Sequence, residues 1–251
     1  MRVEVAARTD RGRRRRSNED RAVYSSIEEP AGSERRTWVL AVADGVGGGP
    51  QGDIAAEMAT GAISTRLASA SGDSESRLRW LYLEANRAVR GSDVPESSTP
   101  GRATTLVAAL LKDDTTHVAN IGDSRAYLLR DHRLTQVTRD HSWVSEEVAA
   151  GRLSARQATN HARRNIITKS LGKRTPIDPD IFDVGPLADG DTILLCSDGL
   201  YTMVDDDKIA AILESGDVVS ATRGLVDVAN ERGGLDNIAV VVARASRANS
   251  R

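Results

Sequence analysis

Apolar residues in this chain occur in two patterns, short continuous runs and longer stripes with helical spacing. Continuous runs of strand length cover residues 37–43 and 192–196, and each ends at a polar turn residue. Shorter or alternating runs predict further strands over residues 2–7, 104–111, 116–120, 125–130, 133–138 and 237–244. Short polar turns separate the strands between residues 104 and 138, so we expect these strands to form an antiparallel meander.

Helical spacing is clearest in the second quarter of the chain. Its apolar residues follow the i, i+3, i+4, i+7, i+11 pattern of a helix with one buried face: Leu78, Leu81, Tyr82, Ala85 and Val89. Asp53 is a candidate N-terminal cap for a preceding helix, whose apolar face carries Ala55, Ala59, Ile63 and Leu67. Two further helices are predicted over residues 206–214 and 217–231.

Two other segments lack an apolar stripe. Residues 91–101 are rich in Ser and Pro and predict an exposed loop. Residues 141–171 have helical character but a polar sequence, so we expect a mobile helical excursion on the surface. Strands and helices come in blocks, which favours an α+β fold with antiparallel sheets over a doubly wound fold. Since the sequence has no repeat and no domain boundary, residues 1–251 are expected to form a single domain.

Composition narrows the class of protein. The chain has 251 residues, of which 39% are hydrophobic and 28% charged, as in ordinary soluble globular proteins. Its net charge of −2 gives no general reason to bind nucleic acid or an anionic membrane. Cys196, the single cysteine, excludes an internal disulfide and lies in an apolar run, which indicates a buried small residue. No segment resembles a membrane span or a signal peptide, so we expect a cytoplasmic location.

Candidate chemistry lies at the ends of the apolar runs. Four aspartates stand there beside a turn residue: Asp44, Asp123, Asp198 and Asp236. A strand end fixes the backbone while the turn lets oxygen ligands converge, as hard cations require. An isolated Asp-Gly is more often a turn former. Four such aspartates, together with Arg15, Glu19 and Asp20, instead indicate a carboxylate cluster that holds divalent cations.

The same residues belong to short motifs that occur in order along the chain: Arg15–Asp20, Asp44–Gly48, Ala103–Leu106, Gly122–Arg125, Arg139–Ser142, Ser197–Leu200 and Asp236–Ile238. Together these motifs resemble the metal-dependent protein Ser/Thr phosphatases (PPM family, type 2C phosphatases) in their compact bacterial form. The resemblance runs from about residue 3 to about residue 244. It implies a four-layer α-β-β-α sandwich with a metal site at one end of two central antiparallel sheets. It also implies that residues 141–172 form a flap beside that site.

The resemblance further implies a ligand set for two core ions, Mg²⁺ or Mn²⁺. Asp44 would bridge both ions, and the carbonyl oxygen of Gly45 would bind one of them. Asp198 and Asp236 would complete the other ion. Asp198 would also share a weaker third ion with Asp123.

Residues near the N-terminus complete the implied site. Glu19 and Asp20 would bind the ions directly or through waters. Arg15 would grip the substrate phosphate, because its planar fork can bind two oxygens. For the basic run at residues 13–16, a solvated loop or a weak nucleic-acid patch is the alternative.

One departure from the family pattern concerns protonation of the leaving group. Many members carry a histidine in or just after the Asp-Gly-x-Gly-Gly segment, whereas this chain has Val46 and Gly49 there. His141 is a candidate by its position in the family pattern, and a role in orienting a loop is equally open. Without a catalytic histidine, a metal-bound water or a different residue would supply the proton, or turnover would be lower.

The expected function is therefore hydrolysis of phosphoserine and phosphothreonine in proteins by a metal-activated bridging water. No motif places a Cys, Ser or His nucleophile beside an activating base, so no phospho-enzyme is expected. A non-catalytic pseudophosphatase that binds phosphoproteins or kinases is the alternative suggested by the missing histidine. A phosphatase for small phosphoesters is a third. Expected partners are phosphorylated proteins, with a Ser/Thr protein kinase as a further candidate.

Overall fold

The computed structural model describes residues 2–29, 32–33, 35–46, 51–91, 102–112 and 115–246. The glycines at 47–49 lie outside the described residues, as does nearly all of the loop expected at 91–101.

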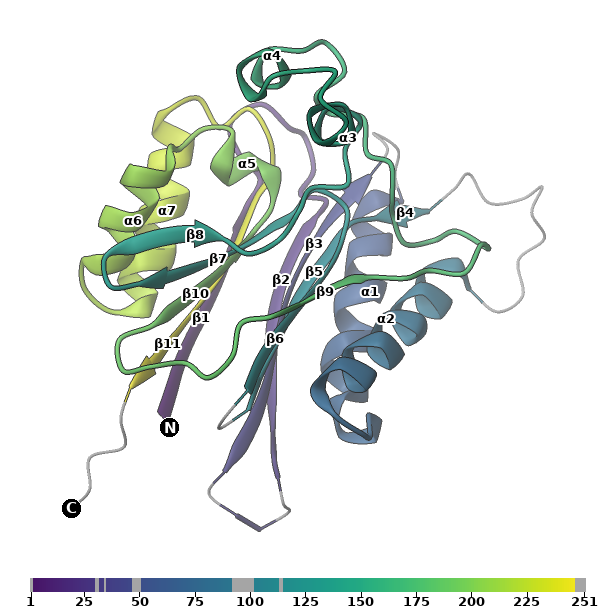
Figure 1. The fold of residues 1–251 in the computed structure, drawn as a ribbon, viewed down its shortest axis with the longest axis vertical. Helices are drawn as coiled ribbons and strands as arrows, with labels where there is room; N and C mark the ends of the chain where they lie inside the picture. The colour runs from purple at the N-terminus through teal and green to yellow at the C-terminus, as the bar shows by residue number, and fades with distance from the viewer. Residues whose placement is uncertain are drawn as a thin grey trace.

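Two antiparallel sheets form the centre of the molecule (Figure 1). The β11 sheet contains, in spatial order, β1 (Arg2–Asp10), β11 (Ile238–Ser246), β10 (Thr192–Cys196), β7 (Arg125–Arg130) and β8 (Arg133–Gln136). The β3 sheet contains β2 (Asp20–Glu28), β3 (Arg36–Val46), β5 (Leu106–Lys112), β6 (Thr115–Ile121) and β9 (Asp180–Asp183). The short strand β4 (Ala103–Thr104) pairs with the end of β3.

Helices cover the outer faces of both sheets (Figure 1). The β3 sheet is covered by α1 (Gly52–Arg66) and α2 (Ser74–Arg90), which are joined by a short 3₁₀ turn, η1 (Leu67–Ser69). The β11 sheet is covered by α6 (Asp206–Glu214) and α7 (Val218–Glu231), with the one-turn helix α5 (Asp198–Tyr201) at its end. The resulting order of helices, sheet, sheet and helices confirms the predicted four-layer sandwich.

The core consists of three apolar layers between these four. The middle layer packs the two sheets against each other and includes Leu40, Val42 and Val241. Val39 and Ala41, on the opposite face of β3, pack instead beneath α1 and α2. Because β3 is buried on both faces, its sequence is continuously apolar and does not alternate.

The helix predictions are largely confirmed, with one correction at a helix start. The predicted stripe of α2 is fully buried, and the side chain of Asp73 caps that helix by accepting the Ser76 N–H at 2.8 Å. Asp53 is not a cap, because α1 begins at Gly52 with Gln51 in the cap position. The Asp53 carboxylate accepts the N–H of Ile54 at 2.8 Å, within the first turn, where a negative charge favours the helix dipole.

The predicted meander is confirmed for its two antiparallel pairs and is wrong where they join. Strands β5 and β6 pair in the β3 sheet, whereas β7 and β8 pair in the β11 sheet. The chain crosses between the sheets at Gly122, whose φ of 112° directs it away from a return hairpin. This crossing matters for the site, since Asp123 lies on it.

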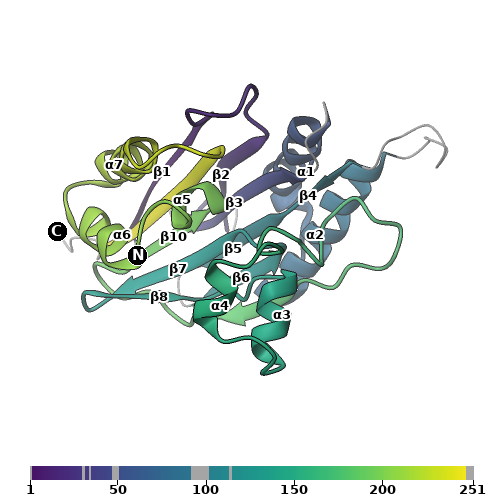
Figure 2. The ribbon, with the colours of Figure 1, turned by 90° about the horizontal axis from the view of Figure 1, so that it is seen from above.

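The excursion after β8 is helical only in part. It contains α3 (Trp143–Ala149) and α4 (Ala155–Thr159), followed by turns, and it lies above one end of the sheets (Figures 1 and 2). Cys196 is buried, as predicted. Among the described helices, none has the length and apolar character needed to cross a membrane.

Candidate metal centre

The predicted acidic residues meet at one end of the two sheets. Asp20 begins β2 and lies directly opposite Asp44, near the end of β3, in the antiparallel register. Asp198 follows β10, and Asp236 precedes β11, the neighbour of β10. Asp123 reaches the same end from the crossing between β6 and β7. Five carboxylates from five strand ends are thus brought together by the fold.

The electrostatics of these aspartates show that they are close neighbours. Burial raises the pKa of Asp44 well above its usual range, and the negative charges of Asp20, Asp198, Asp123 and Asp236 raise it further. The pKa of Asp198 is raised in the same way, by burial and then by Asp123 and Asp236. Burial is also the main cause that raises the pKa of Asp20 to about 7 and that of Asp123 to about 6. Such repulsion between carboxylates is offset by bound protons or by a bound cation.

The donor set fits a hard divalent cation. The Oδ1 atoms of Asp123 and Asp198 are buried and have no hydrogen-bond partner among the described residues. Buried polar atoms are nearly always satisfied, so two unsatisfied carboxylate oxygens point to a ligand. Carboxylate and carbonyl oxygens suit Mg²⁺ and Mn²⁺.

The arrangement is not a closed cage. Within the described part of the chain, no group of three or more His, Cys, Asp and Glu side chains is already arranged to hold a metal ion. The Arg15 guanidinium donates to Oδ2 of Asp236, and the Ser197 hydroxyl donates to Oδ2 of Asp20, each at 2.6 Å. An open arrangement of this kind is compatible with Mg²⁺, which retains several water ligands and needs only one or two carboxylates from the protein.

Gly45 and Glu19 lie beside the cluster. A Cβ atom at Gly45 would stand 2.3 Å from the carbonyl oxygen of Gly52, so only glycine allows the start of α1 to approach the end of β3. The Glu19 carboxylate faces Gly52 in the same place, and the Gly45 N–H donates to the Glu19 carbonyl at 3.2 Å. Both predicted residues are therefore at the site.

Arg15 reaches the cluster from the loop between β1 and β2. Its guanidinium donates to Oδ2 of Asp236 at 2.6 Å, and this bond is the main cause that raises the pKa of Arg15. Asp44 and Glu19 add smaller contributions of the same sign. The side chain is 46% exposed, so one end of the guanidinium is held while the rest is open to solvent.

Asn237 positions that loop, a role that its place in the motif Asp236–Ile238 did not reveal. Its amide NH₂ donates to the carbonyl oxygens of Arg11 and Ser17, each at 2.8 Å, and its Oδ1 accepts the Glu19 N–H at 2.8 Å. Asn237 is 4% exposed. Its position directly after Asp236 was the one signal that pointed to it.

Comparison with known proteins agrees with this geometry. A family model for protein phosphatase 2C matches residues 16–237. The chain belongs to the protein phosphatase 2C family. The serine/threonine phosphatase stp of Listeria monocytogenes is 39% identical over 243 residues, which are 94% of this chain and 93% of that protein.

Solved structures of phosphatases share the fold. The Mycobacterium tuberculosis serine/threonine phosphatase PstP/Ppp superimposes with a TM-score of 0.85 at 34% identity, covering 98% of this chain and 99% of the other. The catalytic domain of PstP in complex with two manganese ions gives a TM-score of 0.83 at 33% identity, with coverages of 98% and 99%. These matches confirm the predicted family and enzyme class, and they favour a catalytic member over the non-catalytic binding module.

In this phosphatase His141 is a structural link between the flap and the Gly122 crossing. Its Nδ1 accepts the Gly122 N–H at 3.1 Å, and its own N–H donates to the Gly122 carbonyl at 2.9 Å. Its Nε2 lies 3.2 Å from a carboxylate oxygen of Asp180. Burial lowers the pKa of His141, with a further contribution from Lys169. This geometry favours a loop-orienting role over that of a general acid.

Proposed function

We propose that this chain is a Mn²⁺- or Mg²⁺-dependent phosphatase that removes phosphate from phosphoserine and phosphothreonine in proteins. The observation that carries the proposal is a group of five neighbouring aspartates beside a half-exposed arginine, in which Asp123 and Asp198 each have a buried oxygen without a hydrogen-bond partner among the described residues. The names of the relatives support the same substrate class.

The proposed ligands follow from the positions of the carboxylates. Asp44 lies opposite Asp20 in the β2–β3 pair, and four other aspartates raise its pKa, so Asp44 would hold both core ions, with the Gly45 carbonyl beside it. Asp198, Asp236 and Asp20 would bind the same ions, and Glu19 would bind directly or through water. Asp123 and Asp198, whose buried Oδ1 atoms have no hydrogen-bond partner among the described residues, would hold a weaker third ion.

When bound, the ions would neutralise charge on the phosphoryl oxygens and lower the pKa of the attacking water. The residues of the chain provide the rest. Arg15 binds two phosphoryl oxygens with the free part of its guanidinium, while Asp236 holds the other part. Asn237 keeps the loop of Arg15 in register with β11.

Three finer expectations stay predictions. They are that residues 1–251 form one catalytic domain, that the protein acts in the cytoplasm, and that a Ser/Thr protein kinase is a partner. Pairing of β1 with β11 supports the first, because it joins segments near both ends of the described chain. Co-purification that enriches neither a kinase nor kinase substrates would count against the third.

The decisive experiment is hydrolysis of p-nitrophenyl phosphate and of a phosphothreonine peptide by the purified protein, with Mn²⁺ and with EDTA. We expect Mn²⁺-dependent phosphate release from both substrates. Folded protein that binds Mn²⁺ but releases phosphate from neither would revive the non-catalytic binding module. Release from p-nitrophenyl phosphate alone would indicate a small phosphoester as the substrate.

A further inference from the structure

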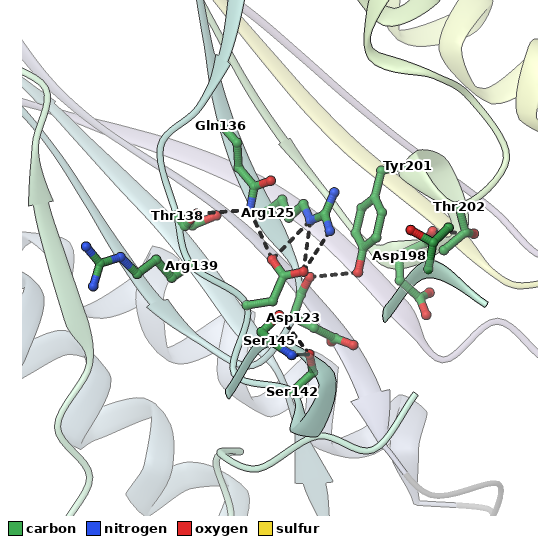
Figure 3. A network of polar contacts seen from close by, with 12 residues as sticks. Asp123, Arg125, Gln136, Thr138, Arg139, Ser142, Ser145, Asp198, Tyr201 and Thr202 are labelled. Atoms are coloured by element: carbon green, nitrogen blue, oxygen red, sulfur yellow. Dashed lines mark hydrogen bonds and ion pairs between the residues drawn. The ribbon is translucent and has the colours of Figure 1, made fainter. Parts of the chain in front are cut away.

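Asp123 and Asp198 belong to different segments of the chain, and one side chain joins these segments by a hydrogen bond. Asp123 lies on the crossing between β6 and β7, and Asp198 is the first residue of α5. The side chain of Tyr201, at the other end of α5, spans the gap. Its hydroxyl donates to the backbone carbonyl of Asp123 at 3.0 Å (Figure 3).

The ring of Tyr201 is held in one orientation by a cation. The guanidinium carbon of Arg125 lies 3.6 Å from the centre of the ring, within the range of a cation–π contact. Arg125 is itself fixed by Asp140, to which it donates through Nε at 3.0 Å and through a terminal nitrogen at 2.7 Å. Gln136 also donates to Asp140, at 3.1 Å. The hydroxyl of Tyr201 therefore has little freedom to leave Asp123.

The α5 side of this link is equally well tied. The hydroxyl and the N–H of Thr202 both reach the carbonyl oxygen of Asp198, at 2.7 and 3.1 Å. A Cβ atom at Gly199 would lie 1.9 Å from the Asn237 carbonyl, so α5 sits directly against the start of β11. One rigid turn thus carries both Asp198 and Tyr201.

The contacts that end on Asp123 and Asp198 reach their backbone carbonyl oxygens and leave their carboxylates free. The hydrogen bond from Tyr201 ends on the carbonyl oxygen of Asp123, and Oδ1 of Asp123 has no partner among the described residues. The same holds for Oδ1 of Asp198. In Figure 3 the side chains of Asp123 and Asp198 both lie near the hydroxyl end of the Tyr201 ring. A link of this kind sets a distance between two ligands without consuming their oxygens.

We propose that Tyr201 is a positioning residue, which sets the spacing of Asp123 and Asp198 and thereby the affinity of the cation that they share. The inference rests on the proposed function, because it assigns that ion to these two carboxylates. Groups that hydrogen-bond a ligating side chain typically contribute about 10- to 100-fold to metal affinity. The hydroxyl of Tyr201 acts one step further from the ion, through the backbone of Asp123, so we expect the lower end of that range.

The test compares two Tyr→Phe substitutions. Tyr201→Phe removes the hydroxyl and retains the ring that stacks on Arg125. Tyr82→Phe is the matched control, since its buried hydroxyl also bonds backbone carbonyls, those of Leu106 and Ala119 at 3.0 and 2.6 Å, in the layer beneath α2. Asp123→Asn marks the ion in question by weakening it directly.

Each protein is stripped with EDTA and titrated with Mn²⁺ by calorimetry, and its thermal unfolding is measured without metal. We expect Tyr201→Phe to weaken the ion that Asp123→Asn weakens, by about tenfold or more, and to leave the tighter ions unchanged. Tyr82→Phe should lower the unfolding temperature and leave every Mn²⁺ affinity unchanged.

Three results would overturn the inference. They are an unchanged titration for Tyr201→Phe, an equal effect of both Tyr→Phe variants on Mn²⁺ affinity, and the absence of any ion sensitive to Asp123→Asn. Failure of the proposed function is distinguishable, because the unsubstituted protein would then release no phosphate from either substrate, whatever its Mn²⁺ titration shows.

Discussion

Asp44 lies among four other aspartates, and the charge of each of them raises its pKa. In the metal-free protein this position is therefore unfavourable for an ionised carboxylate. We predict that Asp44→Asn has two opposite effects. Activity with Mn²⁺ falls on the order of 10²–10³-fold or more, as expected for the loss of a central electrostatic group. The unfolding temperature in EDTA at pH 8 rises, because one repelled charge is gone.

Kinetics with Mn²⁺ and thermal unfolding in EDTA measure these two effects. Near-normal turnover by Asp44→Asn would contradict the proposed bridge. An unchanged or lower unfolding temperature in EDTA would show that the carboxylates do not repel one another in the folded protein.

Arg15 divides its guanidinium between Asp236 and solvent, where a phosphate would bind. We predict that Arg15→Lys raises KM for a phosphothreonine peptide about 10- to 100-fold, because a compact ammonium cannot bind Asp236 and two phosphoryl oxygens together. This range corresponds to about 1.5–3 kcal/mol for a hydrogen bond to a charged group. Steady-state kinetics at saturating Mn²⁺ measure it. Arg14→Lys, on an exposed neighbour in the same loop, should leave KM unchanged.

At the scale of elements, the loop from Arg11 to Glu19 depends on one amide at the start of β11. Asn237 binds this loop at three points, at Arg11, Ser17 and Glu19. We predict that Asn237→Ala lowers the free energy of unfolding by about 1–3 kcal/mol, since buried partners are left unsatisfied. It should also raise KM, because Arg15 loses its fixed position. Denaturant unfolding and kinetics with the phosphothreonine peptide test these two effects. A loss of stability with unchanged KM would show that Asn237 does not position Arg15.

His141 joins the flap to the crossing at Gly122, and its role can be separated from acid catalysis. We predict that His141→Asn, whose amide oxygen can accept the Gly122 N–H, keeps most of the activity. His141→Ala should lower the unfolding temperature. Comparison of p-nitrophenyl phosphate with phenyl phosphate gives the test. A general acid would matter most for phenyl phosphate, the poorer leaving group, so a selective loss of that activity in His141→Asn would restore the catalytic role.

The elements that sequence patterns predicted best are those buried on both faces. β3 and β10 have continuous apolar sequences and were located to within a few residues. β2 was missed because it is an edge strand whose residues are mostly half-exposed, and β9 has only four residues. The separation of β6 from β7 depends on which sheet each strand joins, and local spacing carries no such information.

In the candidate site, too, local patterns identified some residues and missed those that act through long-range contacts. Asp44, Asp198 and Asp236 were identified because each ends an apolar run beside a turn residue. Ser197 and Asn237 were in the same motifs but were given no role, since their hydrogen bonds join residues 177 and more than 200 positions apart. Side chains that position ligands leave no periodic trace in the sequence.

At the scale of the whole molecule, packing of the two sheets brings together, at one end, aspartates whose negative charges repel one another. The folded, metal-free protein holds Asp20 with a pKa of about 7 and Asp123 with a pKa of about 6, against an ordinary value of 3.8. Folded protein therefore binds protons that the unfolded chain has already released. The stabilisation from these protons is fully present below about pH 4 and is lost as the pH rises through 6 and 7.

We therefore predict that in EDTA the unfolding temperature rises as the pH is lowered from 8 to about 6. With Mn²⁺ the trend reverses, because the ions bind the deprotonated carboxylates, so the Mn²⁺-induced rise should be larger at pH 8 than at pH 6. His141 opposes the first trend, since its lowered pKa destabilises the fold as the pH falls through about 6.5. Asp20→Asn separates the two contributions, because it removes a raised carboxylate and leaves His141 in place. The variant should show a flatter dependence on pH in EDTA. If the unsubstituted protein instead loses stability steadily from pH 8 to 6 without metal, its carboxylates are not held close enough to share a cation.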